Sequence, residues 1–246
     1  GQSFRILVEE LAELYSAAVQ QRAPALALPA GQYGDYCAEE QAWLASDTYR
    51  RALGAWGQRL LDYDGDFKLF ADRVGEVPRR FVGRQLRVDL DDALADRLRN
   101  AAQQAGVSLY AFMLTAFGVL CARQSGQRRF MVGSALANRI WPRFRRTVGM
   151  FVNMVPVPMC FENEQESFAQ ALAKVSESVD FALLHSAVPL PEIVKHMGWS
   201  QRLNGEAPFN VGFSFHDSLA ARPRFAGLDV GIDEALSNGS SKFDLS

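Results

Sequence analysis

Histidine and cysteine are scarce in this chain of 246 residues, which holds three of each. The histidines are isolated, and no His-Glu-x-x-His or Cys-x-x-Cys motif is present, so a metal site has no support in the sequence. An odd number of widely spaced cysteines is typical of reduced thiols and not of a disulfide framework. We therefore expect no metal and a cytoplasmic location.

Long apolar runs and glycine-rich nucleotide motifs are also missing. No stretch approaches the ~20 apolar residues that span a bilayer, and no signal peptide is visible. Neither Gly-x-Gly-x-x-Gly nor Gly-x-x-x-x-Gly-Lys-Ser/Thr occurs, and Gly-x-Ser-x-Gly is absent too. The formal net charge is −2, so neither nucleic acid nor a membrane is expected as the main partner.

One short segment departs from this balance of charge. It places four cations within eight residues: Arg139, Arg143, Arg145 and Arg146. Such a run is either a solvated loop or a surface that docks an acidic partner.

Helical and strand patterns alternate along the chain, which predicts an α/β layered architecture. Expected helices cover residues 3–20, 35–61, 91–106, 108–122, 167–184 and 192–197. Expected strands cover residues 82–90, 129–136, 151–160, 209–215 and 228–232. Ser3, Asp91 or Asp92, Ser108 and Ser167 are the expected N-caps. The helix over residues 109–122 is apolar almost all round and is expected to be buried.

The first helix carries an apolar stripe that predicts its buried face. The stripe consists of Phe4, Leu7, Leu11, Leu14 and Tyr15, and glutamates occupy the opposite side. The next helical region contains Gly54 and Gly57, which weaken it and indicate a possible break.

An unusual polar residue, Asn153, lies within the apolar strand pattern of residues 148–159. A buried amide without partners costs about 1–3 kcal/mol, so Asn153 must bond to backbone, to another side chain or to a ligand. It is either a structural amide or part of a binding site. A second unusual run, residues 132–139, ends in Asn138 and Arg139.

Several segments in a fixed order resemble the condensation domain of nonribosomal peptide synthetases. The Tyr-Gly-Asp-Tyr-Cys-Ala run at 33–38 is similar to the family's Tyr-x-Asp-Phe/Tyr-Ala segment. Residues 132–139 resemble Val-Gly-x-x-x-Ala-Asn-Arg, and residues 148–153 resemble Ile/Val-Gly-x-Phe-Val-Asn. Further similar segments are Trp56 with Leu60, a divergent His185–Pro189, Pro208–Val211 and Lys242–Leu245.

The resemblance implies a chloramphenicol-acetyltransferase-like two-lobe fold, with a mixed sheet and flanking helices. Residues 1–78 would be the end of the N-terminal lobe and the inter-lobe connection, and residues 79–246 a truncated C-terminal lobe. Gly1 and Ser3 look like the remnant of the catalytic His-His-x-x-x-Asp-Gly motif. The motif histidines would precede Gly1, so the printed chain alone should not catalyse condensation.

The resemblance also implies a reaction and its partners. The reaction is amide bond formation between acyl groups held as phosphopantetheine thioesters on donor and acceptor peptidyl carrier protein domains, with adenylation domains as neighbours. No cofactor would be bound directly. The substrate tunnel and lobe interface would involve Asn138, Arg139, Gly149, Phe151 and Asn153. Carrier contacts would involve Arg143, Arg145 and Arg146.

Two alternatives to an amide-forming enzyme stay open at this point. The chain could be a degenerate, non-catalytic domain that docks carrier or tailoring proteins. It could also be a related epimerization domain or ester-forming acyltransferase, although the Lys-Phe-Asp-Leu and Val-Gly-x-Phe-Val-Asn segments favour condensation over both.

Overall fold

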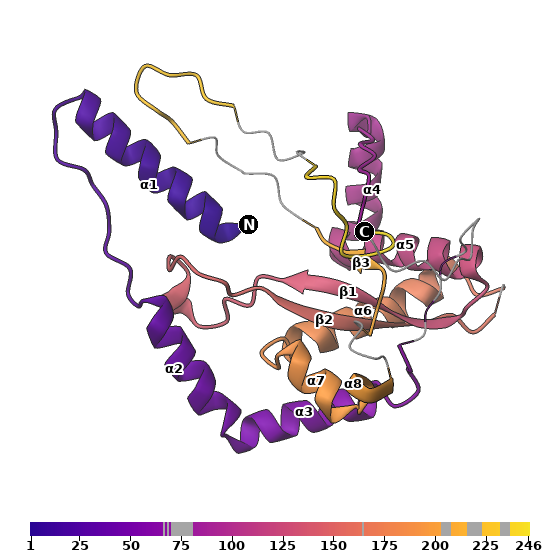
Figure 1. Ribbon diagram of the computed structural model, residues 1–246. Coiled ribbons are helices and arrows are strands. Elements are labelled where there is room, and N and C mark those ends of the chain that lie inside the picture. The colour runs from indigo at the N-terminus through magenta and orange to yellow at the C-terminus, as the bar shows by residue number, and fades with distance from the viewer. Residues whose placement is uncertain are drawn as a thin grey trace. The chain divides into compact units, whose positions relative to one another are not determined.

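The computed structural model is shown in Figure 1. It describes residues 1–65, 67, 69, 81–163, 165–202, 208–215, 223–231 and 237–246. The chain divides into two compact units, each built from three stretches of sequence. The first unit contains Gly1–Arg51, Ala137–Asn153 and His216–Leu236, and the second contains Ala52–Leu136, Met154–Phe215 and Ser237–Ser246.

Helix α1 (Gln2–Val19) opens the first unit, and its N-cap is Gly1. The predicted cap, Ser3, is wrong, because Ser3 lies inside the first turn and its hydroxyl bonds to a distant segment. The predicted buried stripe is wrong as well. Phe4, Leu7 and Leu11 are more than half exposed, and the buried positions are Ile6, Ala12, Ser16 and Ala17. Periodicity identified an apolar face, but it does not say what covers that face.

The second helical region is two helices, α2 (Tyr33–Leu44) and α3 (Asp47–Arg59). The break falls at residues 45–46, and not at Gly54 or Gly57 as predicted. Ser46 explains the position, since its hydroxyl donates to the Trp43 carbonyl at 2.6 Å and accepts from the Tyr49 amide at 3.2 Å. One side chain thus ends α2 and caps α3.

The second unit holds most of the remaining helices and the sheet (Figure 1). They are α4 (Asp92–Gln104), α5 (Leu109–Ser125), β1 (Arg129–Leu136), β2 (Asn153–Cys160), α6 (Phe168–Leu184), α7 (Leu190–His196), α8 (Trp199–Arg202) and β3 (Gly212–Phe213). A 3₁₀ turn, η1 (Pro142–Phe144), belongs to the first unit.

The predicted caps of these helices are confirmed. The side chains of Asp91, Ser108 and Ser167 accept from backbone N–H groups of the first turn at 2.7, 3.1 and 3.3 Å. The Gln170 side chain completes a capping box with Ser167. Helix α5 is buried along one face only, because Leu120 is half exposed.

The sheet has the strand order β2-β1-β3. Strands β1 and β3 are parallel, with Gly133 opposite Gly212. The residue after β2 donates to the residue before β1 (Phe161 N to Arg128 O, 2.9 Å), so β2 runs antiparallel to β1. The mixed sheet with flanking helices confirms the expected fold class. Buried strand residues form its core: Met131, Val132, Val155, Val157 and Met159.

Strand predictions were less accurate than helix predictions. Strand β2 begins at Asn153 and not at residue 151, and β3 covers only Gly212–Phe213. In residues 82–90, predicted as a strand, only Val82 forms a bridge, with Ser240. The predicted strand at 228–232 is reduced to a bridge between Phe225 and Leu228, and residue 232 lies outside the described residues. Alternation makes a segment suitable for a strand, but pairing also needs a neighbouring backbone.

Some expectations concern residues that are not described. The division near residue 78 falls within 70–80, which lie outside the described residues, so it stays a prediction. His216 lies outside them too. No single helix in the described ranges is long and apolar enough to cross a membrane, and α4 and α5 reach that length and composition only as a pair bent by 103°.

Candidate functional site at the start of the first helix

The Ser3 hydroxyl joins the first turn of α1 to two segments that are distant in the sequence. It donates to the Gly149 carbonyl at 2.8 Å and accepts from the Gly149 amide at 3.1 Å. It also accepts from Arg139 Nη2 at 2.8 Å. A serine hydroxyl offers one donor and two acceptor sites, so all of its capacity is used. Ser3 therefore holds the site together and is not a free nucleophile.

Arg139 anchors the loop that follows it. Its Nη1 donates to the carbonyls of Phe144 and Thr147 at 2.6 and 2.7 Å, and its guanidinium lies 4.1 Å from the centre of the Phe151 ring. Burial lowers the pKa of Arg139, although an arginine stays protonated. No carboxylate among the described residues pairs with it. Within the described residues its positive charge therefore remains uncompensated by a carboxylate.

An aromatic cluster supports this network from the other side. Tyr36, Phe144 and Phe151 are buried, and Tyr33 and Trp141 pack against them. The Tyr36 and Phe151 rings lie 4.6 Å apart, and burial raises the pKa of Tyr36. The Tyr33 hydroxyl donates to the Met150 carbonyl at 2.7 Å. Two segments that resemble family motifs, residues 33–38 and 148–153, are thus packed against each other.

Gly149 has a steric reason to be glycine. The Tyr33 ring occupies the place where a Cβ on residue 149 would stand. The same arrangement recurs nearby, where a Cβ on Gly31 would lie 2.7 Å from the Phe144 ring. Close approach of a ring to the backbone is possible only because glycine has no side chain.

The structure gathers Ser3, Arg139, Gly149 and Phe151 of the predicted site residues. Gly1 is exposed beside them at the helix start, and Asn153 is buried, with 9 % exposure, as the first residue of β2.

Asn138 adopts a left-handed backbone with φ of 46°. Its buried Oδ1 has no hydrogen-bond partner among the described residues. Asn tolerates this conformation better than most residues, which explains the residue type without a ligand.

The basic loop is largely paired within the first unit. Arg143 forms an ion pair with Glu39 at 2.5 Å, and Arg146 pairs with Glu9 at 3.3 Å and Glu10 at 3.8 Å. These pairs are half exposed and individually weak. Within the described ranges Arg145 makes no side-chain bond, so it is the cation of this loop that is best placed to meet a partner.

Sequence reasoning missed several residues of this site. Thr147 is buried and donates to the Gly31 carbonyl at 2.6 Å, and Phe144 is the centre of the cluster. Neither falls in a segment that resembles a family motif. The tyrosines at 33 and 36 do, but the sequence does not say which segment they pack against.

Motif segments also meet in the second unit. The Phe209 ring occupies the Cβ position of Gly133, and a Cβ on Gly212 would lie 2.8 Å from the Phe243 ring. Backbone hydrogen bonds join the same segments, from Gly133 N to Val211 O and from Gly212 N to Leu245 O, both at 2.9 Å.

His185 is the C-cap of α6. Its carbonyl accepts from the Trp56 indole N–H at 3.1 Å, and burial lowers the pKa of its ring. The contact with Trp56 is made by the His185 backbone and not by its ring. In the described part of the chain, no three His, Cys, Asp or Glu side chains are grouped as metal ligands.

The segments that resemble family motifs pack against one another within each unit. This packing agrees with the comparison of the chain with known families. The family model of the condensation domain matches residues 1–246. The chain belongs to the condensation domain family. The chloramphenicol-acetyltransferase-like fold expected from the resemblance is therefore confirmed.

Curated relatives of this condensation domain are peptide synthetases. The chain is 29% identical over 245 residues to malpibaldin synthetase of Mortierella alpina, and 28% identical over 248 residues to a linear gramicidin synthase from Brevibacillus parabrevis. Each match covers 100% of the chain but only 4% and 5% of the relatives' own lengths.

Solved structures show the same architecture. The first condensation domain of the calcium-dependent antibiotic synthetase is similar with a TM-score of 0.73 and 24% identity, covering 92% of this chain and 48% of that one. The X-domain from teicoplanin biosynthesis is similar with a TM-score of 0.72 and 25% identity, covering 86% and 48%. The chain thus spans about half of these solved chains.

Proposed function

We propose that this chain is part of an enzyme that joins two acyl groups through an amide bond. Each group would arrive as a phosphopantetheine thioester on a peptidyl carrier protein domain. The observation that carries the proposal is the Ser3 hydroxyl, which ties the start of α1 to Arg139 and Gly149. In the family, the catalytic segment leads directly into this helix.

The proposed reaction assigns different tasks to a family motif that would precede Gly1 and to the residues of this chain. The amine of the acceptor attacks the donor thioester carbonyl, a C–N bond forms, and the C–S bond breaks to release the thiol of the donor arm. A histidine upstream of Gly1 would orient the amine or accept its proton, a contribution of roughly 10²–10⁴-fold. Tethering of both substrates supplies proximity.

The residues of this chain would position that histidine. Ser3, Arg139 and the Gly149 backbone fix the first turn of α1, while Phe151 and Tyr33 fix the Gly149 segment. The uncompensated guanidinium and the positive end of the α1 dipole both favour negative charge developing nearby. Arg145 is proposed to contact the acidic surface of a carrier domain.

Reconstitution with loaded carriers tests the proposal. A polypeptide that carries this chain and the residues before Gly1 is mixed with loaded donor and acceptor carrier domains, and amide product is measured by mass spectrometry. We expect product, and an at least tenfold lower turnover for Ser3→Ala with the fold retained. Arg99→Gln, a change on the exposed face of α4, is the control. Absence of product, with no His-His-x-x-x-Asp before Gly1, would overturn the proposal.

A docking function is the second candidate, and one comparison favours it. The X-domain from teicoplanin biosynthesis is 25% identical to this chain and was solved in a complex with OxyB. By analogy, this chain would bind a tailoring protein or a carrier without catalysis. Substitution of both motif histidines in the natural polypeptide, together with partner binding in a pull-down with purified proteins, would favour this candidate over the enzyme.

A further inference from the structure

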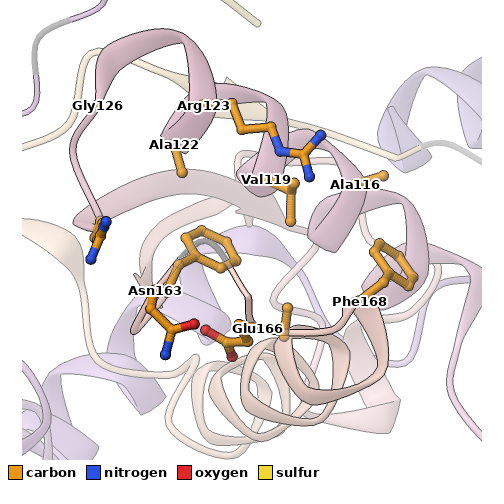
Figure 2. Close-up of a pocket in the computed structure, with 11 residues that line it drawn as sticks. Ala116, Val119, Ala122, Arg123, Gly126, Asn163, Glu166 and Phe168 are labelled. Atoms are coloured by element: carbon orange, nitrogen blue, oxygen red, sulfur yellow. The ribbon is translucent and has the colours of Figure 1, made fainter.

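A cavity of about 690 Å³ lies between α5 and α6 in the second unit (Figure 2). Its walls mix apolar and polar groups, and the apolar ones include Val119, Phe161 and Phe168. Small residues on α5, Ala116 and Ala122, leave the space between the helices open. The volume is in the range of small-molecule sites, which are usually apolar with a few placed polar groups.

Negative charge dominates on the α6 side of this cavity. The Glu166 side chain is only 7 % exposed; its Oε2 accepts from the Glu162 amide at 2.7 Å. Its Oε1 lies 3.0 Å from Lys174 Nζ but accepts no aligned hydrogen bond. The same ammonium also pairs with Glu162 at 2.8 Å. One ammonium is thus shared between two carboxylates on this side of the cavity.

Positive charge dominates on the α5 side. Arg123 extends along this wall, opposite Asn163 and Glu166 (Figure 2). Its guanidinium makes no hydrogen bond or ion pair with any residue that the structure describes. Arg128, a second lining cation, donates to the Glu162 carbonyl at 3.0 Å. The cavity therefore contains a guanidinium that has no partner among the described residues and a carboxylate that is buried.

The geometry points to a binding site for a zwitterion with an apolar side chain, either a free α-amino acid or a short peptide. The ammonium would approach Glu166 Oε1, the carboxylate would approach Arg123, and the side chain would lie against Phe161 and Phe168. Each charged end is recognised by a group of opposite sign, and the charge-assisted bonds fix the orientation. This inference does not depend on the proposed function.

An NMR titration of the ¹⁵N-labelled 246-residue chain tests the site. The probes are L-leucine and leucyl-leucine, with isocaproate and isoamylamine as analogues that keep the apolar body but lose one charge. We expect saturable shifts confined to residues 116–128 and 161–171, with a Kd on the order of 1 mM or tighter. Tighter binding of leucine identifies a free amino acid as the ligand, and tighter binding of the dipeptide identifies a short peptide.

Variants distinguish binding at this site from non-specific binding. Arg123 is exposed and has no partner among the described residues, and Arg123→Gln should weaken binding at least tenfold, as should Glu166→Gln. Arg99→Gln on α4 is the matched control and should bind as the wild type does. Equal binding of isocaproate or isoamylamine, unchanged affinity in Arg123→Gln, or no saturable shift would each overturn the inference.

Discussion

Glycines and aromatic rings meet in pairs in both compact units. Gly149 meets Tyr33, Gly133 meets Phe209, and Gly212 meets Phe243. In the first two pairs both residues come from segments that resemble family motifs, and in the third pair Phe243 does. None of these glycines has a positive φ, so packing and not backbone conformation requires them. At Asn138, by contrast, the backbone conformation explains the residue type, because its φ is positive.

Replacing Gly149 with alanine tests this steric role. The new methyl group meets the Tyr33 ring, so the ring or the backbone must shift, and we expect the free energy of unfolding to fall by about 1–3 kcal/mol. Urea denaturation measures the change. Gly34→Ala is the control, because a Cβ at Gly34 meets no atom within 4 Å.

A double-mutant cycle identifies the cause. In a Tyr33→Ala background the ring is gone, so adding Gly149→Ala should cost much less than in the wild type. An equal cost in both backgrounds would show that residue 149 needs glycine for another reason.

Two residues predicted for the site, Ser3 and Arg139, are joined by a hydrogen bond, and their part in the site stays a prediction. The expected helix cap at Ser3 was wrong because its hydroxyl is fully bonded to Gly149 and Arg139, residues more than 130 positions away. Local pattern cannot reveal a bond of that range.

Helix boundaries follow from short-range chemistry. Asp91, Ser108 and Ser167 cap their helices as predicted, because a cap bonds to N–H groups only two or three residues away. At its other end, α5 stops at Gly126, whose φ is +70°. Left-handed geometry of this kind is typical of helix ends and favours glycine.

Two glycine-to-alanine substitutions should change the free energy of unfolding in opposite directions. At Gly126 the left-handed backbone costs a residue with a Cβ about 1–2 kcal/mol, so Gly126→Ala should destabilise the protein. Gly54 lies inside α3 with free space around it, so Gly54→Ala should stabilise by about 0.5–1 kcal/mol. Thermal and urea unfolding measure the change in stability of both variants. A change in the same direction for both would contradict this prediction.

Strand pairing and the buried faces of helices could not be predicted from the sequence pattern alone. The alternation in residues 82–90 predicts a strand, yet only Val82 is bridged. The apolar stripe on α1 predicts a buried face, yet Phe4, Leu7 and Leu11 are more than half exposed. In both cases the pattern specifies a face, and burial depends on a partner from elsewhere.

Across the whole molecule, several titratable groups are buried in their neutral form. Burial raises the pKa of the Cys121 thiol to about 11 and that of Tyr63 to about 12. Cys121 is 1 % exposed on α5, whereas Cys37 is exposed. Since the unfolded chain ionises these groups at lower pH, folding stability and pH are linked.

Stability should fall as the pH rises from about 9 to about 11. Below its unfolded pKa of 9.0 the Cys121 thiol is neutral in both states, and above it only the unfolded state ionises, until the folded pKa is passed. The loss from this group is about 3 kcal/mol. Urea titrations at pH 8 and 10.5 measure it, and Cys121→Ala should reduce the difference. An unchanged difference in that variant would assign the effect to the tyrosines.

At the scale of the molecule, the sequence supplied the family resemblance and the α/β class, and both are confirmed. It did not supply the division into compact units, each assembled from three separated stretches. Contacts between distant segments decide that division. Hydrophobic periodicity within a window of about fifteen residues does not show those contacts.

The glycine–ring pairs have a consequence for segment exchange between relatives. A crossover anywhere between residues 33 and 149 takes Tyr33 from one parent and Gly149 from the other, and a crossover between 133 and 209 separates Gly133 from Phe209. If one parent supplies the aromatic ring and the other has a larger residue in place of the glycine, the two side chains clash in the chimera. This holds however similar the parents are elsewhere. Compatible parents are therefore those that match at both members of each pair.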